Sequence, residues 1–170
     1  MKKVGYIFSI ILLSVFILSC KHKPRGKDVR QRESDRKVEV TRGKTIVKMK
    51  KHGGVYHIPC KINGNKMEFI FDTGASDITM SLTEALFLYK QNKLSDSDFL
   101  GVEQYRIANG SIEEGTVIRL RSVEIGNRKL TNVRASIVHN MEAPLLLGQS
   151  ALAKFGKISI DYKKNEITFE

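Results

Sequence analysis

The sequence has few of the residues on which disulfide, metal or nucleotide chemistry depends. Its only cysteines are Cys20 and Cys60, so a mature domain that follows Cys20 has no intrachain disulfide. The four histidines, at positions 22, 52, 57 and 139, lack the spacing of metal ligands, and no glycine-rich phosphate loop is present. We therefore expect no metal and no organic cofactor. Cysteine peptidase chemistry is disfavoured, because His57 lies three residues from Cys60 on the same predicted strand.

The whole chain has a net charge of +11, but the predicted folded domain is not basic. Residues 54–170 contain 14 Lys+Arg and 14 Asp+Glu, whereas residues 21–53 contain 13 Lys+Arg and 4 Asp+Glu. The charge excess therefore gives no support for nucleic-acid binding by the domain. Residues 20–53 are predicted to be a basic flexible linker, with a weak strand pattern at Thr45–Met49. The linker either attracts an anionic bilayer or is only a soluble spacer.

Residues 1–19 have the pattern of a signal peptide, because Lys2 and Lys3 precede a mostly apolar run. The run ends in Ile17-Leu18-Ser19-Cys20, which resembles the lipobox of bacterial lipoproteins. That resemblance implies cleavage before Cys20 and lipidation of its thiol. The expected location is the bacterial cell envelope, on the periplasmic face of a membrane. An uncleaved N-terminal membrane anchor is the alternative, because the basic residues directly after the run favour retention in the cytoplasm.

The stretch from Phe69 to Met80 contains the strongest chemical signal in the chain. Three apolar residues lead into Asp72, and a turn of small residues follows, namely Thr73, Gly74, Ala75 and Ser76. This pattern predicts a carboxylate at the end of a buried strand, with hydroxyl groups nearby that donate hydrogen bonds. Two such carboxylates facing each other share one proton, and the pair then activates a water molecule.

This stretch resembles the active-site loop of the aspartic proteases, and the short chain resembles their retropepsin-like, single-lobe group. Leu145–Gly148, followed by Gln149–Leu152, resembles the second signature of that family, and Tyr105–Gly110 resembles the segment that bacterial members have in the flap. The resemblance covers residues 54–170. It implies Asp72 as the catalytic residue and Thr73, Gly74, Ala75 and Ser76 as loop support. The implied flap residues are Ala108, Asn109 and Gly110, and the residues of the second signature are Leu146, Leu147 and Gly148.

The pattern of strands and turns predicts an all-β domain over residues 54–170, and the resemblance implies a retropepsin-like closed antiparallel β-barrel lobe with two short helices. Asn63-Gly64 is a strong hairpin signal. The predicted helices are 81–92, which starts with a capping pattern at Ser81 and Glu84, and 149–155. The predicted strands are 55–62, 66–72, 78–80, 104–108, 115–120, 121–125, 129–138, 145–147, 157–162 and 166–169.

The chain contains one Asp-Thr-Gly, and Asp161 lacks the small residue and glycine that would make a second loop. Activity therefore implies a homodimer with one Asp72 from each subunit around a two-fold axis. The resemblance implies that Thr73 braces its counterpart across that axis. Two functions remain open: an endopeptidase that acts on peptide or protein substrates at a membrane, and a catalytically silent peptide-binding module.

Overall fold

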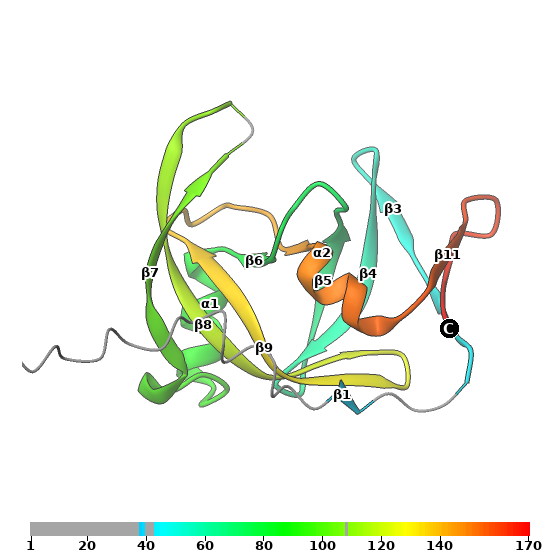
Figure 1. The fold of residues 1–170 in the computed structure, drawn as a ribbon, viewed down its shortest axis with the longest axis horizontal. Helices are drawn as coiled ribbons and strands as arrows, with labels where there is room; N and C mark the ends of the chain where they lie inside the picture. Colours follow the sequence, from blue (N-terminus) through cyan, green and yellow to red (C-terminus); the bar gives the residue numbers. More distant parts are fainter. Residues whose placement is uncertain (1–37, 40–42, 108) are drawn as a thin grey trace, which may run out of the picture. The chain divides into compact units, whose positions relative to one another are not determined.

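The computed structural model describes residues 38–39, 43–107 and 109–170 (Figure 1), and one hairpin in it leads directly to Asp72. The hairpin joins β4 (Val55–Ile62) to β5 (Asn65–Phe71) through Asn63 and Gly64. Both turn residues have positive φ, 49° and 88°, the geometry that matches the twist of two antiparallel strands. The predicted hairpin is confirmed. Alternate side chains of β4 are buried in the core, namely Ile58, Cys60 and Ile62.

The described residues are mostly β, with two short α-helices, as the sequence predicts. The helices are α1 (Leu82–Lys90) and α2 (Gln149–Leu152), and the 3₁₀ segments are η2 (Asp96–Asp98) and η3 (Ala153–Phe155). The remaining strands are β1 (Val38–Glu39), β2 (Thr45–Lys48), β3 (Lys50–His52), β6 (Ile78–Met80), β7 (Phe99–Arg106), β8 (Ile112–Ile125), β9 (Arg128–Val138), β10 (Leu146–Leu147), β11 (Ile158–Asp161) and β12 (Glu166–Phe169).

The strands form two sheets. The larger sheet has the order β1-β9-β6-β10-β5-β4-β8-β7, with β3 paired to β4 and an additional pairing of β8 with β9. The smaller sheet has the order β11-β12-β2. Most pairs are antiparallel, but β10 runs parallel to β5, and β6 runs parallel to β9. The short strand β10 therefore lies between the two strands that flank the Asp72 loop.

Strands also precede Gly54, the residue at which the sequence analysis begins the protease domain. β2 pairs with β12 over four residues, and β3 pairs with β4. Val47 and Met49 are buried in the core, because β2 has an alternating pattern with one face towards the rest of the domain. Residues 1–37, which include Cys20, lie outside the described residues.

The hairpin of β7 and β8 extends away from the rest of the sheet (Figure 1). β8 is one continuous strand of 14 residues. The sequence predicts two strands here, 115–120 and 121–125, each in a separate hairpin, and this division is wrong. The strand is continuous because β8 pairs with β7 over its first half and with β9 from Gly115 to Ile125. One long strand thus connects the tip of the hairpin to the core.

Helix α1 begins after Ser81, whose Oγ accepts a hydrogen bond from the backbone N–H of Glu84 at 3.3 Å. This is one half of the predicted capping box. Oε2 of Glu84 is buried without a hydrogen-bond partner, so it does not provide the reciprocal half. Among the residues that the structure describes, no helix has both the length and the apolar character needed to cross a membrane.

Arg128, at the start of β9, is a buried cation that connects several segments. Its side chain is 3% exposed and donates hydrogen bonds to the carbonyl oxygens of Gly43, Phe155 and Phe169 at 2.6, 2.8 and 3.0 Å. It also donates to Oγ1 of Thr45 at 3.1 Å. Because these acceptors belong to separate segments, one guanidinium ties the smaller sheet to the larger one.

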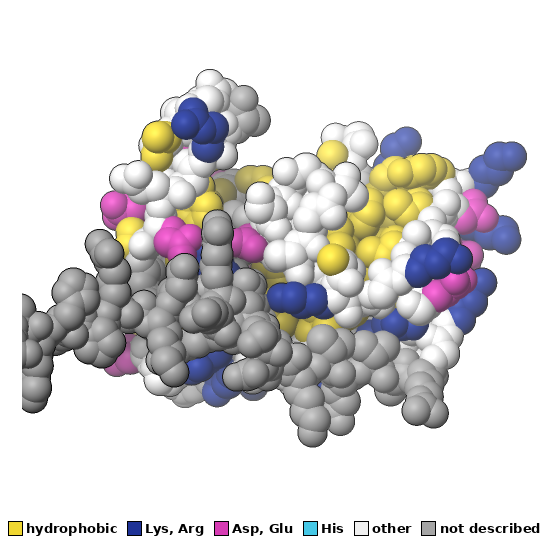
Figure 2. Space-filling model, in the orientation of Figure 1, with side chains coloured by type: hydrophobic (Ala, Val, Ile, Leu, Met, Phe, Trp, Pro, Cys, Tyr) yellow, Lys and Arg dark blue, Asp and Glu magenta, His cyan; other side chains and the backbone are white. Residues whose placement is uncertain are grey.

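Hydrophobic side chains also gather on the surface around β3, β4 and β11 (Figure 2). Tyr162, which is 61% exposed, packs against Tyr56 with ring centroids 5.3 Å apart. Ile158 and Ile160 of β11 are partly buried against the core. This area is an apolar surface at the edge strand of the smaller sheet.

Candidate active site

The Asp72 carboxylate lies at the end of β5, where the backbone turns back on itself. Its Oδ1 atom accepts hydrogen bonds from the backbone N–H groups of Gly74 and Ala75, at 2.8 and 3.2 Å. The loop that follows Asp72 therefore fixes the orientation of its carboxyl group. Thr73, Gly74 and Ser76 are exposed, so one side of this loop faces solvent.

Strand β10 and Gly148 support this loop from within the domain. The backbone N–H of Asp72 donates to the carbonyl oxygen of Leu147 at 3.3 Å, and Leu147 is fully buried. A Cβ atom on Gly148 would lie 2.3 Å from the carbonyl oxygen of Asp77 and 2.7 Å from that of Ala75. Only glycine leaves room for this approach, so the second signature lies directly against the loop.

The first residues of α2 add three hydrogen bonds to the loop. The backbone N–H groups of Gln149 and Ser150 donate to the carbonyl oxygens of Ala75 and Ser76, at 2.9 and 2.8 Å. The side chain of Gln149 donates from Nε2 to the carbonyl oxygen of Thr73 at 2.8 Å. This role of Gln149 was not predicted from the sequence, although its place directly after Gly148 indicates that it lies close to the Asp72 loop.

The tip of the β7–β8 hairpin is organised by Asn109 and Gly110. Oδ1 of Asn109 accepts a hydrogen bond from the backbone N–H of Ser111 at 2.8 Å, and Gly110 has a φ of 89°. The guanidinium of Arg106 donates to the carbonyl oxygen of Gly110 at 3.1 Å. These contacts make a tight turn. The third flap residue of the prediction, Ala108, lies outside the described residues.

A cleft of about 510 Å³ lies between the Asp72 loop and the end of β7 that leads into the tip of this hairpin. It has room for several side chains of an extended peptide. Its lining contains both apolar and polar side chains. The lining residues are Asp72, Gly74, Ala75, Ser76, Asp77, Thr79, Tyr105, Arg106, Ile107, Ser136, Val138, Ala143, Pro144 and Leu146.

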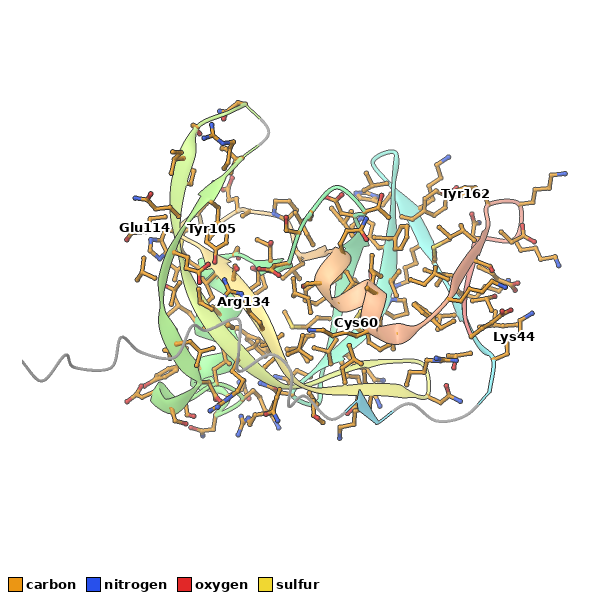
Figure 3. All side chains as sticks on the ribbon, viewed as in Figure 1. Lys44, Cys60, Tyr105, Glu114, Arg134 and Tyr162 are labelled. Atoms are coloured by element: carbon orange, nitrogen blue, oxygen red, sulfur yellow. The ribbon has the colours of Figure 1, made fainter. Side chains whose placement is uncertain are left out.

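Four polar residues at or beside the cleft, namely Asp77, Glu103, Arg134 and Ser136, were not predicted as site residues from the sequence, and neither was the contact of Ser136 with Tyr105. Arg134 lies between two carboxylates, with Nε 3.4 Å from Oδ2 of Asp77 and with Nη1 and Nη2 3.0 and 2.5 Å from Oε1 and Oε2 of Glu103. The Ser136 hydroxyl donates to the Tyr105 hydroxyl at 2.7 Å. Tyr105 and Arg134 are labelled in Figure 3, on β7 and β9.

The surroundings of Arg134 and Tyr105 shift both of their pKa values upwards. Burial lowers the pKa of Arg134, but its hydrogen bonds with Glu103 and the charges of Glu103 and Asp77 outweigh that effect, so the pKa is raised. Arg134 is a permanent cation in this position. Burial raises the pKa of the Tyr105 phenol, although its hydrogen bond with Ser136 opposes the shift. Tyr105 therefore stays neutral near pH 7.

Among the described residues, no three His, Cys, Asp or Glu side chains are close enough together to hold a metal ion.

Comparisons with known proteins agree with this geometry. The model of the family described as gag-polyprotein putative aspartyl protease matches residues 58–154, more than half of the chain. The crystal structure of a retropepsin-like aspartic protease from Rickettsia conorii is similar, with a TM-score of 0.53 and 25% sequence identity over 79% of this chain and 93% of that one. The chain belongs to the retropepsin-like aspartic protease family.

One curated relative is an uncharacterized protein of Rickettsia prowazekii (strain Madrid E). It is 34% identical over 110 residues, which make up 64% of this chain and 44% of that protein. The match thus spans less than half the length of that relative.

Proposed function

We propose that the chain is an aspartic endopeptidase that hydrolyses peptide bonds as a homodimer, with one Asp72 from each subunit. The observation that carries this proposal is the Asp72 carboxylate, which lines a peptide-sized cleft and has its Oδ1 held by two backbone N–H groups. Asp161 is no substitute for the second carboxylate, because it lies at the end of β11 and does not line the cleft that contains Asp72.

Two Asp72 carboxyl groups in contact share one proton, because like charges about 3 Å apart do not both ionise. The ionised group takes a proton from the attacking water, and the protonated group donates a hydrogen bond to the scissile carbonyl oxygen. The apparent pKa values belong to the pair. In each subunit, the N–H groups of Gly74 and Ala75 keep one oxygen oriented while the other faces the reaction.

The outer strand β11 supports the homodimer. It forms an edge of the smaller sheet, and an edge strand offers unpaired backbone N–H and C=O groups to a strand from a second copy. The exposed ring of Tyr162 and the apolar surface around it would be covered by such a pairing. The pairing of β8 with β9 closes a ring of strands in the order β9-β6-β10-β5-β4-β8, which supports the closed-barrel lobe.

The test is cleavage of a mixed peptide library by the full chain in detergent, at several protein concentrations and at acidic and neutral pH. A rate that rises faster than linearly with protein, and that is lost in Asp72→Asn but kept in Asp161→Asn, is the expected result. Dimers that do not cleave, and whose peptide binding is unchanged in Asp72→Asn, would show a catalytically silent binding module instead.

We further propose that the enzyme is tethered to the cell envelope through a lipid on Cys20. The support is the run Ile17-Leu18-Ser19-Cys20 at the end of the apolar segment. Incorporation of radiolabelled palmitate in bacteria, abolished by Cys20→Ser, is the expected result. Membrane retention of an unlabelled chain with its N-terminus intact would indicate the uncleaved anchor.

A further inference from the structure

Arg134 lies at a junction between three elements: its own strand β9, the flap strand β7 and the loop that follows Asp72. Its side chain is 12% exposed and starts from β9, a central strand of the core. Its guanidinium makes two contacts with Glu103 on the flap strand β7 and one with Asp77, five residues after Asp72. A planar guanidinium is suited to hold a carboxylate with two parallel hydrogen bonds.

A second contact supports the same side of the flap. Tyr105, two residues after Glu103, accepts a hydrogen bond from Ser136, two residues after Arg134. The ring of Tyr105 packs so closely on β8 that a Cβ atom on Gly115 would lie 2.8 Å from it. Because residues two apart in a strand share a face, both contacts lie on one side of β7. The base of the flap is thus held against β9.

The two carboxylates around Arg134 differ in their surroundings. The side chain of Asp77 is 20% exposed and belongs to the loop held by Gly148 and α2, whereas that of Glu103 is 45% exposed and belongs to the projecting hairpin. The Asp77 contact is therefore the more buried side of the junction, and the Glu103 contact is the side more open to solvent. Asp77 and Tyr105 both line the cleft, so this junction forms one of its walls.

We propose that Arg134 is a positioning residue that couples the flap to the active-site loop, with Glu103 holding the flap closed and Asp77 holding the loop that contains Asp72. The proposal rests on the proposed peptidase function for its kinetic consequences, but the coupling itself is a property of the fold. When substrate holds the hairpin down, Glu103 and Arg134 stay in contact, and Arg134 then presses on the loop through Asp77. Arg134 thus connects the binding of substrate under the flap to the reaction at Asp72.

The kinetic effects of the two carboxylates are expected to differ. Glu103→Gln removes one charge from the flap contact, so KM rises about five- to tenfold with kcat nearly unchanged. Asp77→Asn loosens the loop, so kcat falls about tenfold with a smaller change in KM. In Arg134→Met, KM rises and kcat falls, because the contacts with both carboxylates are lost. Arg134→Lys keeps the charge without the planar fork and restores only part of the activity.

Hydrogen–deuterium exchange of the same full-length proteins tests the coupling without any catalysis. We expect faster exchange of the β7 backbone in Arg134→Met and Glu103→Gln. The control is Glu114→Gln, because Glu114 is on the same hairpin (Figure 3) and on the face of β8 opposite that of Gly115. Unchanged β7 exchange in Glu103→Gln and Arg134→Met would overturn the proposal. Equal changes of kcat and of KM in Glu103→Gln and Asp77→Asn would also overturn it. If the wild type cleaves no peptide but the exchange result holds, the peptidase function fails and the coupling stands.

Discussion

Gln149 holds the carbonyl oxygen of Thr73 with its side-chain Nε2 at 2.8 Å, so the first residue of α2 restrains the Thr73–Gly74 peptide unit, whose N–H donates to Oδ1 of Asp72. The side chain of Gln149 is exposed and has no part in the core. The contact therefore affects the shape of the loop more than the stability of the domain. Gln149 is therefore a positioning residue for the Asp72 loop and has no packing role in the core.

We expect Gln149→Leu to lower kcat about fivefold, which corresponds to about 1 kcal/mol of activation free energy, because the Asp72 loop loses one restraint on its shape. The free energy of unfolding should change by less than about 0.5 kcal/mol. Steady-state kinetics and urea denaturation measure the two quantities. Gln91→Leu, an exposed glutamine after α1, is the matched control. An equal loss of kcat in both variants would show that the Thr73 contact has no special role.

We expect Gly148→Ala to disrupt the loop, because the added methyl would lie 2.3 Å from the carbonyl oxygen of Asp77. The φ of −87° is open to alanine, so the whole effect is steric. The free energy of unfolding should fall by about 2–3 kcal/mol, with at least a tenfold loss of cleavage. Gly53→Ala is the control: its methyl meets open space, and its φ of 57° costs about 1 kcal/mol. Equal unfolding midpoints would contradict the prediction.

We expect Arg128→Met to lower the free energy of unfolding by about 3 kcal/mol, because it removes hydrogen bonds from a charged donor to several buried carbonyl oxygens. Urea denaturation should show a lower midpoint with the same slope. Arg121→Met removes an exposed arginine that donates to the carbonyl oxygens of Asn92 and Lys93, and it should cost about 1 kcal/mol or less. Similar losses in the two variants would show that burial of Arg128 adds nothing.

We expect the buried thiol of Cys60 to make the free energy of unfolding depend on pH in the alkaline range. Burial raises the pKa of its thiol from 9.0 to about 12. Above pH 9 the unfolded chain loses this proton while the folded chain keeps it, so the free energy of unfolding falls by about 1.4 kcal/mol per pH unit until about pH 12. Below pH 9 the thiol contributes no pH dependence. Urea denaturation of the wild type and Cys60→Ala should show this slope as the difference between them, and parallel curves would refute it.

Local sequence patterns predict the hairpins and the Asp72 loop well, because each depends on residues close together in the chain. Asn63-Gly64 needs two positive φ values, and few residue pairs adopt them readily. The apolar run before Asp72 and the short strand before Gly148 are likewise local signals. These patterns are sufficient for an all-β domain and for the position of the candidate carboxylate.

The polar junction at Arg134 could not be predicted in this way. The alternation of Val133, Ala135 and Ile137 predicts one buried face of β9 and leaves the opposite face unassigned. Whether that face meets solvent or another strand depends on how the β7–β8 hairpin bends over it, and no short pattern encodes that bend. The ion pair with Glu103 joins residues 31 positions apart, so only the folded chain brings them together.

The place of β10 between β5 and β6 has a consequence for biosynthesis. The active-site loop is complete only when Leu147 and Gly148 have joined it, about 75 residues after Asp72 has been made. At synthesis rates of roughly 5–20 residues per second, a nascent chain waits roughly 4–15 s between these two events. During that interval the ribosome carries the Asp72 segment without its supporting strand. Because a chain released before Leu147 lacks this support, truncated products of translation should contain no assembled site.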